Sequence, residues 1–223
     1  MNRLLVSIAL AATPLAALPA VLVNQAATTN PDGYFSDAYS TAGSQTYAQT
    51  LADTFVLSGF STVTSITFDG SSEYYQNADL TNLSGFQVRV LDSSYNVLYD
   101  TTVATSVLAP TITGATNVAG GTEYLFTLSG LNLSLASGTY VLNIGAVESD
   151  PNSDAFVWSV GSGGGGTHLS NATFTSSGYA TYADDLAFTV NGTVQATPEP
   201  ASLAALTVGA AVLLRRRRPS ALA

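Results

Sequence analysis

The stretch FQVRV at residues 86–90 shows the pattern that decides the fold. Phe86, Val88 and Val90 fall on one face of an extended chain, and the two polar side chains between them fall on the other. The same period of two marks seven further strand candidates. These are residues 52–57, 63–68, 97–103, 124–128, 140–144, 156–160 and 186–190. The pattern predicts a series of short, half-buried strands.

Turn-forming residues separate these candidates, and five stretches favour tight reversals. They are DGSS at 69–72, DSSYN at 92–96, GG at 120–121, SG at 137–138 and NG at 191–192. No stretch shows a sustained helical period with caps. We therefore predict an all-β fold, a single antiparallel β-sandwich or jelly roll over residues 28–197. Trp158 alternates with Phe156 and Val160, which predicts a place in the core.

The composition excludes several classes of protein. Of the 223 residues, 46% are hydrophobic and only 9% are charged, whereas an average soluble protein is about 25% charged. Lysine and cysteine are absent, and His168 is the one histidine. Disulfide frameworks, thiol and lysine nucleophiles and cysteine-ligated metal sites are therefore excluded.

The charges divide sharply along the chain. Residues 28–197 hold fourteen of the fifteen acids and a single cation, Arg89, which gives a net charge of −13. The two ends together carry a net charge of +4. An acidic middle segment repels nucleic acids and anionic lipids, and it attracts divalent cations or basic partners. We therefore expect no nucleic-acid partner.

The amino end has the features of a secretory signal peptide, which we place at residues 1–26. A short basic head at residues 1–3 precedes an apolar run at residues 4–17, and small residues follow. Ala20 and Ala26 are both possible cleavage positions, because neither follows a clean small-x-small pattern.

An uncleaved anchor helix is the alternative at this end. Pro14 and Pro19 weaken that alternative, because proline interrupts a helix. The absence of cysteine permits export without requiring it. A cleaved signal peptide remains the simpler interpretation of the residues.

The carboxyl end combines a small polar motif, an apolar run and a basic block. Pro198, Glu199 and Pro200 precede the apolar residues 201–214. The basic block consists of Arg215, Arg216, Arg217 and Arg218. A relaxed helical span needs about twenty residues, so the run of fourteen is short. Arginines after such a helix stay in the cytoplasm, which places the middle of the chain outside. This order is typical of a processed sorting signal, and a plain tail anchor is the alternative.

These carboxyl-terminal residues resemble the PEP-CTERM sorting domain of exported bacterial proteins. The resemblance covers about residues 197–218, with motif, helix and basic block at 198–218 in the expected order. It implies cleavage by a membrane peptidase called exosortase, an inner-membrane precursor and a host that makes extracellular polysaccharide. Residues 135–144 and 185–192 also resemble strands that precede such tails, although no motif in them fixes an activity.

Candidate catalytic residues are few. A hydroxyl nucleophile needs a base, and we expect His168 to be a solvated loop residue after the glycine-rich stretch 161–166. Paired carboxylates can hydrolyse glycosides, and the candidates are Glu73, Glu123 and Glu148. The sequence gives no distance between them, and surface solubility explains them more simply. We therefore expect no enzymatic activity.

Calcium is the better candidate ligand, because hard oxygen donors suit Ca²⁺ and the domain is acidic. Alternate residues of the 148–154 stretch supply oxygens. The proposed donors are Glu148, Asp150, Asn152 and Asp154, with Asp184 or Asp185 completing the site. Ala155 and Gly161 stand where an EF-hand needs glycine and glutamate, so we expect a loop site of the sandwich instead.

Four tyrosines in apparent turns or beside the last strands are candidates for stacking on sugar rings. They are Tyr74, Tyr75, Tyr179 and Tyr182. The sequence thus leaves two functions open, both at the cell surface or in the extracellular matrix. One is a structural or adhesive protein, and the other is a calcium-assisted binder of extracellular polysaccharide.

Overall fold

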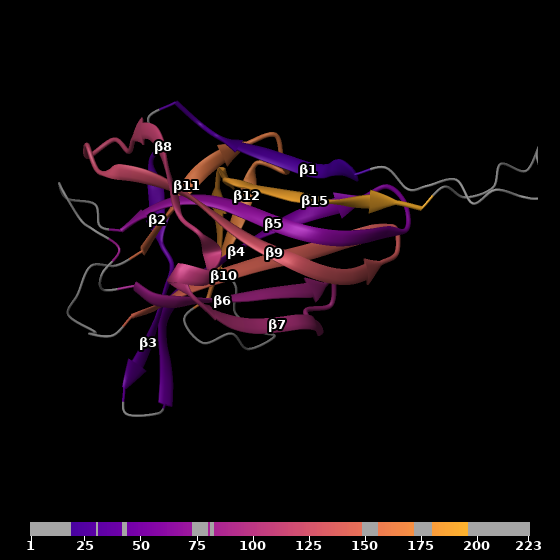
Figure 1. Ribbon diagram of the computed structural model, residues 1–223, viewed down its shortest axis with the longest axis horizontal. Helices are drawn as coiled ribbons and strands as arrows, with labels where there is room; N and C mark the ends of the chain where they lie inside the picture. The colour runs from indigo at the N-terminus through magenta and orange to yellow at the C-terminus, as the bar shows by residue number, and fades with distance from the viewer. Residues whose placement is uncertain are drawn as a thin grey trace, which may run out of the picture. The chain divides into compact units, whose positions relative to one another are not determined.

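The computed structural model describes residues 19–29, 31–41, 44–72, 80, 83–148, 156–171 and 180–195. Within these residues the chain forms two β-sheets (Figure 1). One sheet has eight strands, in the order β14-β11-β1-β15-β5-β9-β8, with β2 paired to β11. The other has seven strands, in the order β13-β12-β4-β3-β10-β6-β7.

Seven of the eight alternating stretches of the sequence each lie within one strand, and residues 186–190 span the end of β14 and the start of β15. The eight-stranded sheet consists of β1 (Pro19–Ala27), β2 (Gly33–Phe35), β5 (Ser61–Ser72), β8 (Thr111–Thr116), β9 (Thr122–Leu135), β11 (Phe156–Ser162), β14 (Asp185–Leu186) and β15 (Phe188–Val194). The seven-stranded sheet consists of β3 (Asp37–Thr41), β4 (Ser44–Leu57), β6 (Leu83–Asp92), β7 (Val97–Ala104), β10 (Gly138–Glu148), β12 (Thr167–Asn171) and β13 (Ala180–Ala183). The 3₁₀ turn η2 (Thr105–Leu108) follows β7.

One apolar core draws side chains from both sheets. Phe68 on β5 stacks on Phe126 of β9, with ring centroids 5.1 Å apart, and meets Phe86 of β6 edge-on at 5.2 Å. Trp158 is fully buried, and its indole N–H donates to the Ala187 carbonyl at 2.9 Å. The nearly all-β prediction and the buried place of Trp158 are therefore confirmed.

One strand pair departs from the predicted antiparallel pattern. β3 runs parallel to β10, with Asp37 opposite Ala146 and Tyr39 opposite Glu148. Directly before β3, the Ser36 hydroxyl donates a hydrogen bond to the Ile144 carbonyl of β10 and accepts one from the Leu51 N–H of β4. The side-chain alternation does not encode strand direction, because it is the same for both directions.

Two of the five predicted turns are strand segments instead. Residues 69–72 continue β5, where a side chain at Gly70 would collide with the Phe156 ring. Residues 191–192 lie inside β15, where a side chain at Gly192 would collide with the Thr62 carbonyl. Each glycine permits close approach of a neighbouring strand, which is the other common role of glycine in sheets.

The turn between β6 and β7 is confirmed, and Asp92 organises it. Its Oδ1 accepts the N–H groups of Ser94 and Asn96 at 2.8 and 2.9 Å. Tyr95 takes a left-handed conformation with φ of 64°. Hydrogen bonds from Asn96 lower the pKa of the Asp92 carboxyl, because they stabilise its charged form.

The first strand overlaps the segment 1–26 that the sequence predicts as a signal peptide. β1 pairs with β15 from Pro19 to Gln25, and Ala26 and Ala27 pair with β11. A cut after Ala26 would therefore remove nearly the whole of a strand that lies between two others. The described domain begins inside the predicted signal segment.

No helix in the described ranges is long and apolar enough to cross a membrane. The predicted sorting helix at residues 201–214 lies outside these ranges, as does most of the predicted signal peptide. Both segments therefore stay predictions from the sequence.

Candidate functional site

Several acidic residues that the composition places on the surface are buried in the structure. Asp37 on β3 and Glu148 on β10 are 3% and 1% exposed, and their carboxyl groups interact with each other. The Asp37 Oδ1 atom also accepts the Phe156 N–H at 2.6 Å. Burial raises the pKa of Asp37 to about 7, because desolvation disfavours the charged form. Asp37 is therefore partly protonated near neutral pH.

A second acidic pair lies in the eight-stranded sheet. The Ser159 hydroxyl donates to the Glu123 Oε2 atom at 2.6 Å. Burial raises the pKa of Glu123 to about 7, and the nearby Asp69 carboxylate contributes a smaller part of this shift. Burial also raises the pKa of Asp69, to about 6. The simpler explanation of Glu123 and Glu148 as surface residues is therefore wrong.

A third acidic pair joins the two sheets and the glycine-rich loop. Asp53 accepts the N–H groups of Thr54 and Leu186 at 2.6 and 2.7 Å. Asp185 accepts the N–H groups of Gly164 and Gly166 at 2.9 and 2.6 Å. Burial raises the pKa of Asp53 to about 7, and Asp185 adds to this shift. The loop at residues 163–166 is therefore held by a carboxylate.

The described residues do not bring the predicted calcium ligands together. Glu148 lies in the seven-stranded sheet near Asp37, whereas Asp185 lies in the eight-stranded sheet and accepts hydrogen bonds from the glycine loop. Asp150, Asn152 and Asp154 lie outside the described residues. Among the residues that the structure describes, no three acidic or histidine side chains could hold a metal ion together. The calcium site stays a prediction.

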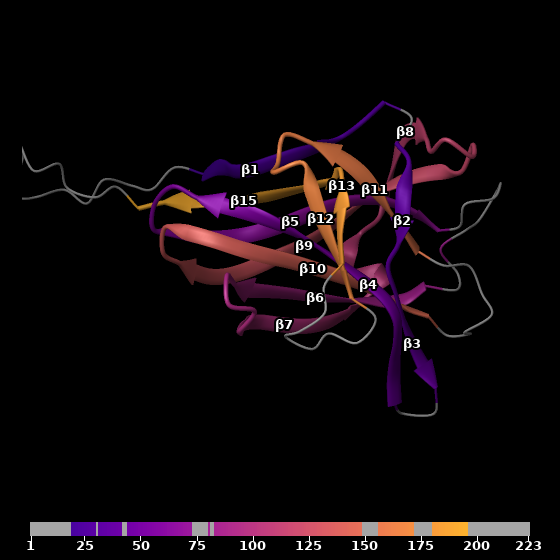
Figure 2. The ribbon, with the colours of Figure 1, turned by 180° about the vertical axis from the view of Figure 1, so that it is seen from behind.

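His168 is the clearest correction to the sequence-based expectations. It lies on β12 and is fully buried, not solvated in a loop. Its ring centroid lies 4.4 Å from that of Tyr34 and 5.4 Å from that of Tyr182, and Figure 2 shows β12 and β13 next to each other. Burial lowers the pKa of His168, because it disfavours the charged ring.

The polar contacts of this aromatic cluster converge on Asp184. The His168 Nδ1 atom lies 3.1 Å from the Asp184 carbonyl, and the Tyr34 hydroxyl donates to the Asp184 Oδ2 atom at 3.2 Å. The His168 Nε2 atom is buried and has no hydrogen-bond partner among the described residues. Tyr182 is 45% exposed. Part of the cluster therefore faces solvent, as a sugar-stacking surface requires.

The candidate glycosidase residues lie in separate networks. Glu123 accepts a hydrogen bond from Ser159 on β11, and Glu148 lies near Asp37 on β3. Glu73, Tyr74, Tyr75 and Tyr179 lie outside the described residues. The described part of the chain therefore gives the paired-carboxylate hypothesis no support.

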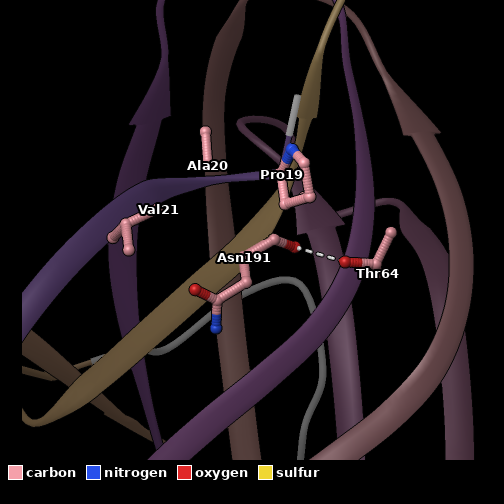
Figure 3. Close-up of a pocket in the computed structure, with 6 residues that line it drawn as sticks. Pro19, Ala20, Val21, Thr64 and Asn191 are labelled. Carbon is pink, nitrogen blue, oxygen red and sulfur yellow. Dashed lines mark hydrogen bonds between the residues drawn. The ribbon is translucent and has the colours of Figure 1, made fainter. Parts of the chain in front are cut away.

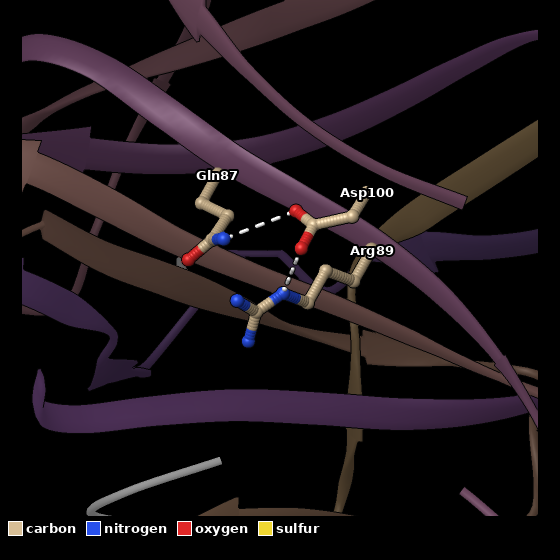
Figure 4. A network of polar contacts seen from close by, with 3 residues as sticks. All are labelled: Gln87, Arg89 and Asp100. Atoms are coloured by element: carbon tan, nitrogen blue, oxygen red, sulfur yellow. Dashed lines mark hydrogen bonds and ion pairs between the residues drawn. The ribbon is translucent and has the colours of Figure 1, made fainter. Parts of the chain in front are cut away.

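Arg89 is the one cation of residues 28–197, and its contacts lie across β6 and β7. The Arg89 Nε atom lies 3.0 Å from the Asp100 Oδ2 atom, and the Gln87 amide donates to the Asp100 Oδ1 atom at 3.0 Å (Figure 4). A cross-strand neighbour thus compensates this charge.

The comparison with known families concerns the carboxyl end. A family model for the PEP-CTERM protein-sorting motif matches residues 196–218. The chain carries a PEP-CTERM sorting motif at its carboxyl end. The match contains Pro198, Glu199 and Pro200 and the four arginines at 215–218, all outside the described residues. No curated protein matches the chain.

The sorting motif has a defined general meaning. It implies an exported protein that is sorted by exosortase, a membrane-associated peptidase, and a precursor that passes through a membrane-anchored stage. The match begins two residues after β15 ends at Val194. The sorting signal therefore follows the last strand of the described domain almost directly.

Proposed function

We propose that this protein is a non-enzymatic component of the cell surface or extracellular matrix, with a structural or adhesive role. The observation that carries the proposal is the sorting-motif match at residues 196–218, directly after a two-sheet domain. The arginine block and the short apolar run hold the precursor in the inner membrane with the domain outside. Cleavage near residues 198–200 then releases or transfers the domain.

The edges of the two sheets support a structural role. All six residues of β8 are exposed, with Ile112 at 67%, and Val97 and Leu98 are exposed on β7. Exposed edge strands can pair with other chains, and lysine is a common residue that prevents this. This chain has no lysine, so its edges lack that protection.

The first experiment expresses the full chain in a bacterial host that carries an exosortase and measures the intact mass of the exported protein. We expect a product that ends near residue 200. A mass that still includes residues 215–218 contradicts the sorting mechanism. Replacing all four arginines with glutamine should prevent processing, whereas replacing them with lysine preserves the charge and is the matched control.

A calcium-assisted polysaccharide-binding role is the second candidate. It is favoured by the half-exposed Tyr182 ring beside Tyr34 and His168, because aromatic faces stack on sugar rings. The test is retention on the host's extracellular polysaccharide, with calcium and with a chelator. Tyr182→Ala should abolish retention, whereas Phe60→Ala removes an exposed ring elsewhere and should not.

The calcium component has a separate test. A ligand that binds the folded state must raise the apparent stability of the protein. We expect excess calcium to raise the melting temperature if the residues at 148–154 hold the ion. An unchanged melting temperature rejects calcium binding and leaves the structural role intact.

A further inference from the structure

The first and last strands of the described domain lie side by side and run in opposite directions. Pro19 pairs with Thr193, and Gln25 pairs with Phe188. The chain therefore enters the domain at the same pole from which it leaves. Figure 3 shows this pole, with Pro19, Ala20 and Val21 beside Asn191 and Thr64.

The two halves of β1 differ in what they contribute to the domain. Leu22 and Val23 pack against the apolar core, and Gln25 is 1% exposed. The Gln25 amide donates to the Thr54 carbonyl at 3.1 Å, which ties β1 to a strand of the other sheet. Pro19, Ala20 and Val21 are exposed instead, Val21 at 61%. The buried contacts of β1 thus begin at Leu22.

A cut after Ala26 is incompatible with this arrangement. It would remove the partner strand of β15 and the residue that pairs with Ser162 on β11. The backbone groups of β15 that face β1 would lose their hydrogen-bond partners beside the fully buried Val190. Unpaired strand groups of this kind are costly when buried.

We propose that signal peptidase cuts the peptide bond between Ala20 and Val21. Water adds across this bond, so that Ala20 gains a carboxylate and Val21 becomes the new amino terminus. Ala20 is a small residue, as the enzyme requires before the cut, and Pro19 ends the apolar run that precedes it. The inference rests on the proposed export of the chain.

The position of this bond has two consequences. Ala20 pairs with Gly192 in the folded sheet, so the cut must come before β15 docks on β1. The new amino terminus then lies at the pole where β15 ends, directly before the sorting motif. The exported domain is therefore processed twice at one pole.

The test is the amino-terminal sequence of the full chain, exported by a bacterial host and recovered outside the cytoplasm. We expect the sequence to start at Val21. Ala20→Leu should remove this terminus, because a large residue before the bond blocks the cut. Ala26→Leu changes another exposed alanine of the same strand and is the matched control.

Each other result overturns a defined part of the argument. An exported chain that begins at Ala27, or at any residue other than Val21, overturns the assigned cut and leaves export standing. An exported chain that keeps Met1 has an uncleaved anchor, which also overturns the cut. A chain found only in the cytoplasm contradicts the proposed function itself.

Discussion

The apolar centre of the core and the buried acidic pairs differ in how well the sequence pattern predicts their burial. Phe68, Phe86 and Phe126 occupy positions that the alternation of the sequence assigns to the core. Asp37, Glu123 and Glu148 are just as buried, yet the sequence places acids of this kind on the surface. Burial of apolar groups stabilises the fold, whereas burial of a carboxyl costs free energy unless it is protonated or hydrogen-bonded.

The largest expected effect comes from the apolar centre. Phe68 is fully buried and meets four other aromatic rings. We expect Phe68→Ala to lower the free energy of unfolding by about 3–5 kcal/mol, through lost transfer energy and a cavity. Urea denaturation measures this change. Phe60→Ala, at an exposed ring, is the control, and equal losses in both variants contradict the assigned core.

The acidic pairs predict a fold that is more stable in mild acid than at alkaline pH. Burial raises the pKa of Asp37, Asp53 and Glu123 to about 7 and that of Asp69 to about 6. Ordinary values are about 4, so the folded state binds more protons than the unfolded state between these limits. The stabilisation is complete below about pH 4 and is lost as pH rises through 7.

His168 changes the stability in the opposite direction. Burial lowers its pKa, so the unfolded state binds more protons, and the fold becomes more stable as the pH rises towards the ordinary pKa of histidine. The four carboxyl groups with raised pKa values together have a larger effect on the pH dependence of stability than this single ring. We expect the melting temperature to fall by several degrees between pH 5 and pH 8. Differential scanning calorimetry in buffers of equal ionic strength measures it, and a rise over this interval contradicts the buried pairs.

The acidic pairs can be tested one at a time with an isosteric amide. Glu123→Gln keeps an oxygen that can accept the Ser159 hydroxyl but removes the charge. We expect it to raise the free energy of unfolding at pH 8 by about 1 kcal/mol and to leave it nearly unchanged at pH 5. Asp100→Asn, at an exposed carboxylate, is the control. Equal effects of Glu123→Gln at both pH values contradict a raised pKa.

The strands and the sorting signal were predictable because their information is local. The period of two in residues 86–90 and 140–144 assigns each side chain to a face without knowledge of its partners. The turn at residues 92–96 is equally local, since Asp92 binds the N–H groups that follow it. The motif, apolar run and arginines at 198–218 form one contiguous pattern, and the family match covers them.

The burial of the acids, by contrast, depends on hydrogen-bond partners that are distant in the sequence. Asp37 lies 119 residues from the Phe156 N–H that it accepts, and Asp53 lies 133 residues from that of Leu186. The glycines at 70 and 192 were misassigned to turns for the same reason. The strand that approaches each of them comes from a distant segment. Nothing within a local window distinguishes such a glycine from a turn glycine.

The smallest expected effect concerns the ion pair between Arg89 and Asp100 (Figure 4). Their side chains are 13% and 38% exposed, so water screens the attraction and competes for the hydrogen bond. We expect a double-mutant cycle of Arg89→Gln and Asp100→Asn to give a coupling energy below about 1 kcal/mol. A coupling energy comparable to the effect of Phe68→Ala would instead mean that charges stabilise this sheet as strongly as its apolar centre does. The contrast between the stabilising core and the costly buried carboxyls would then no longer hold.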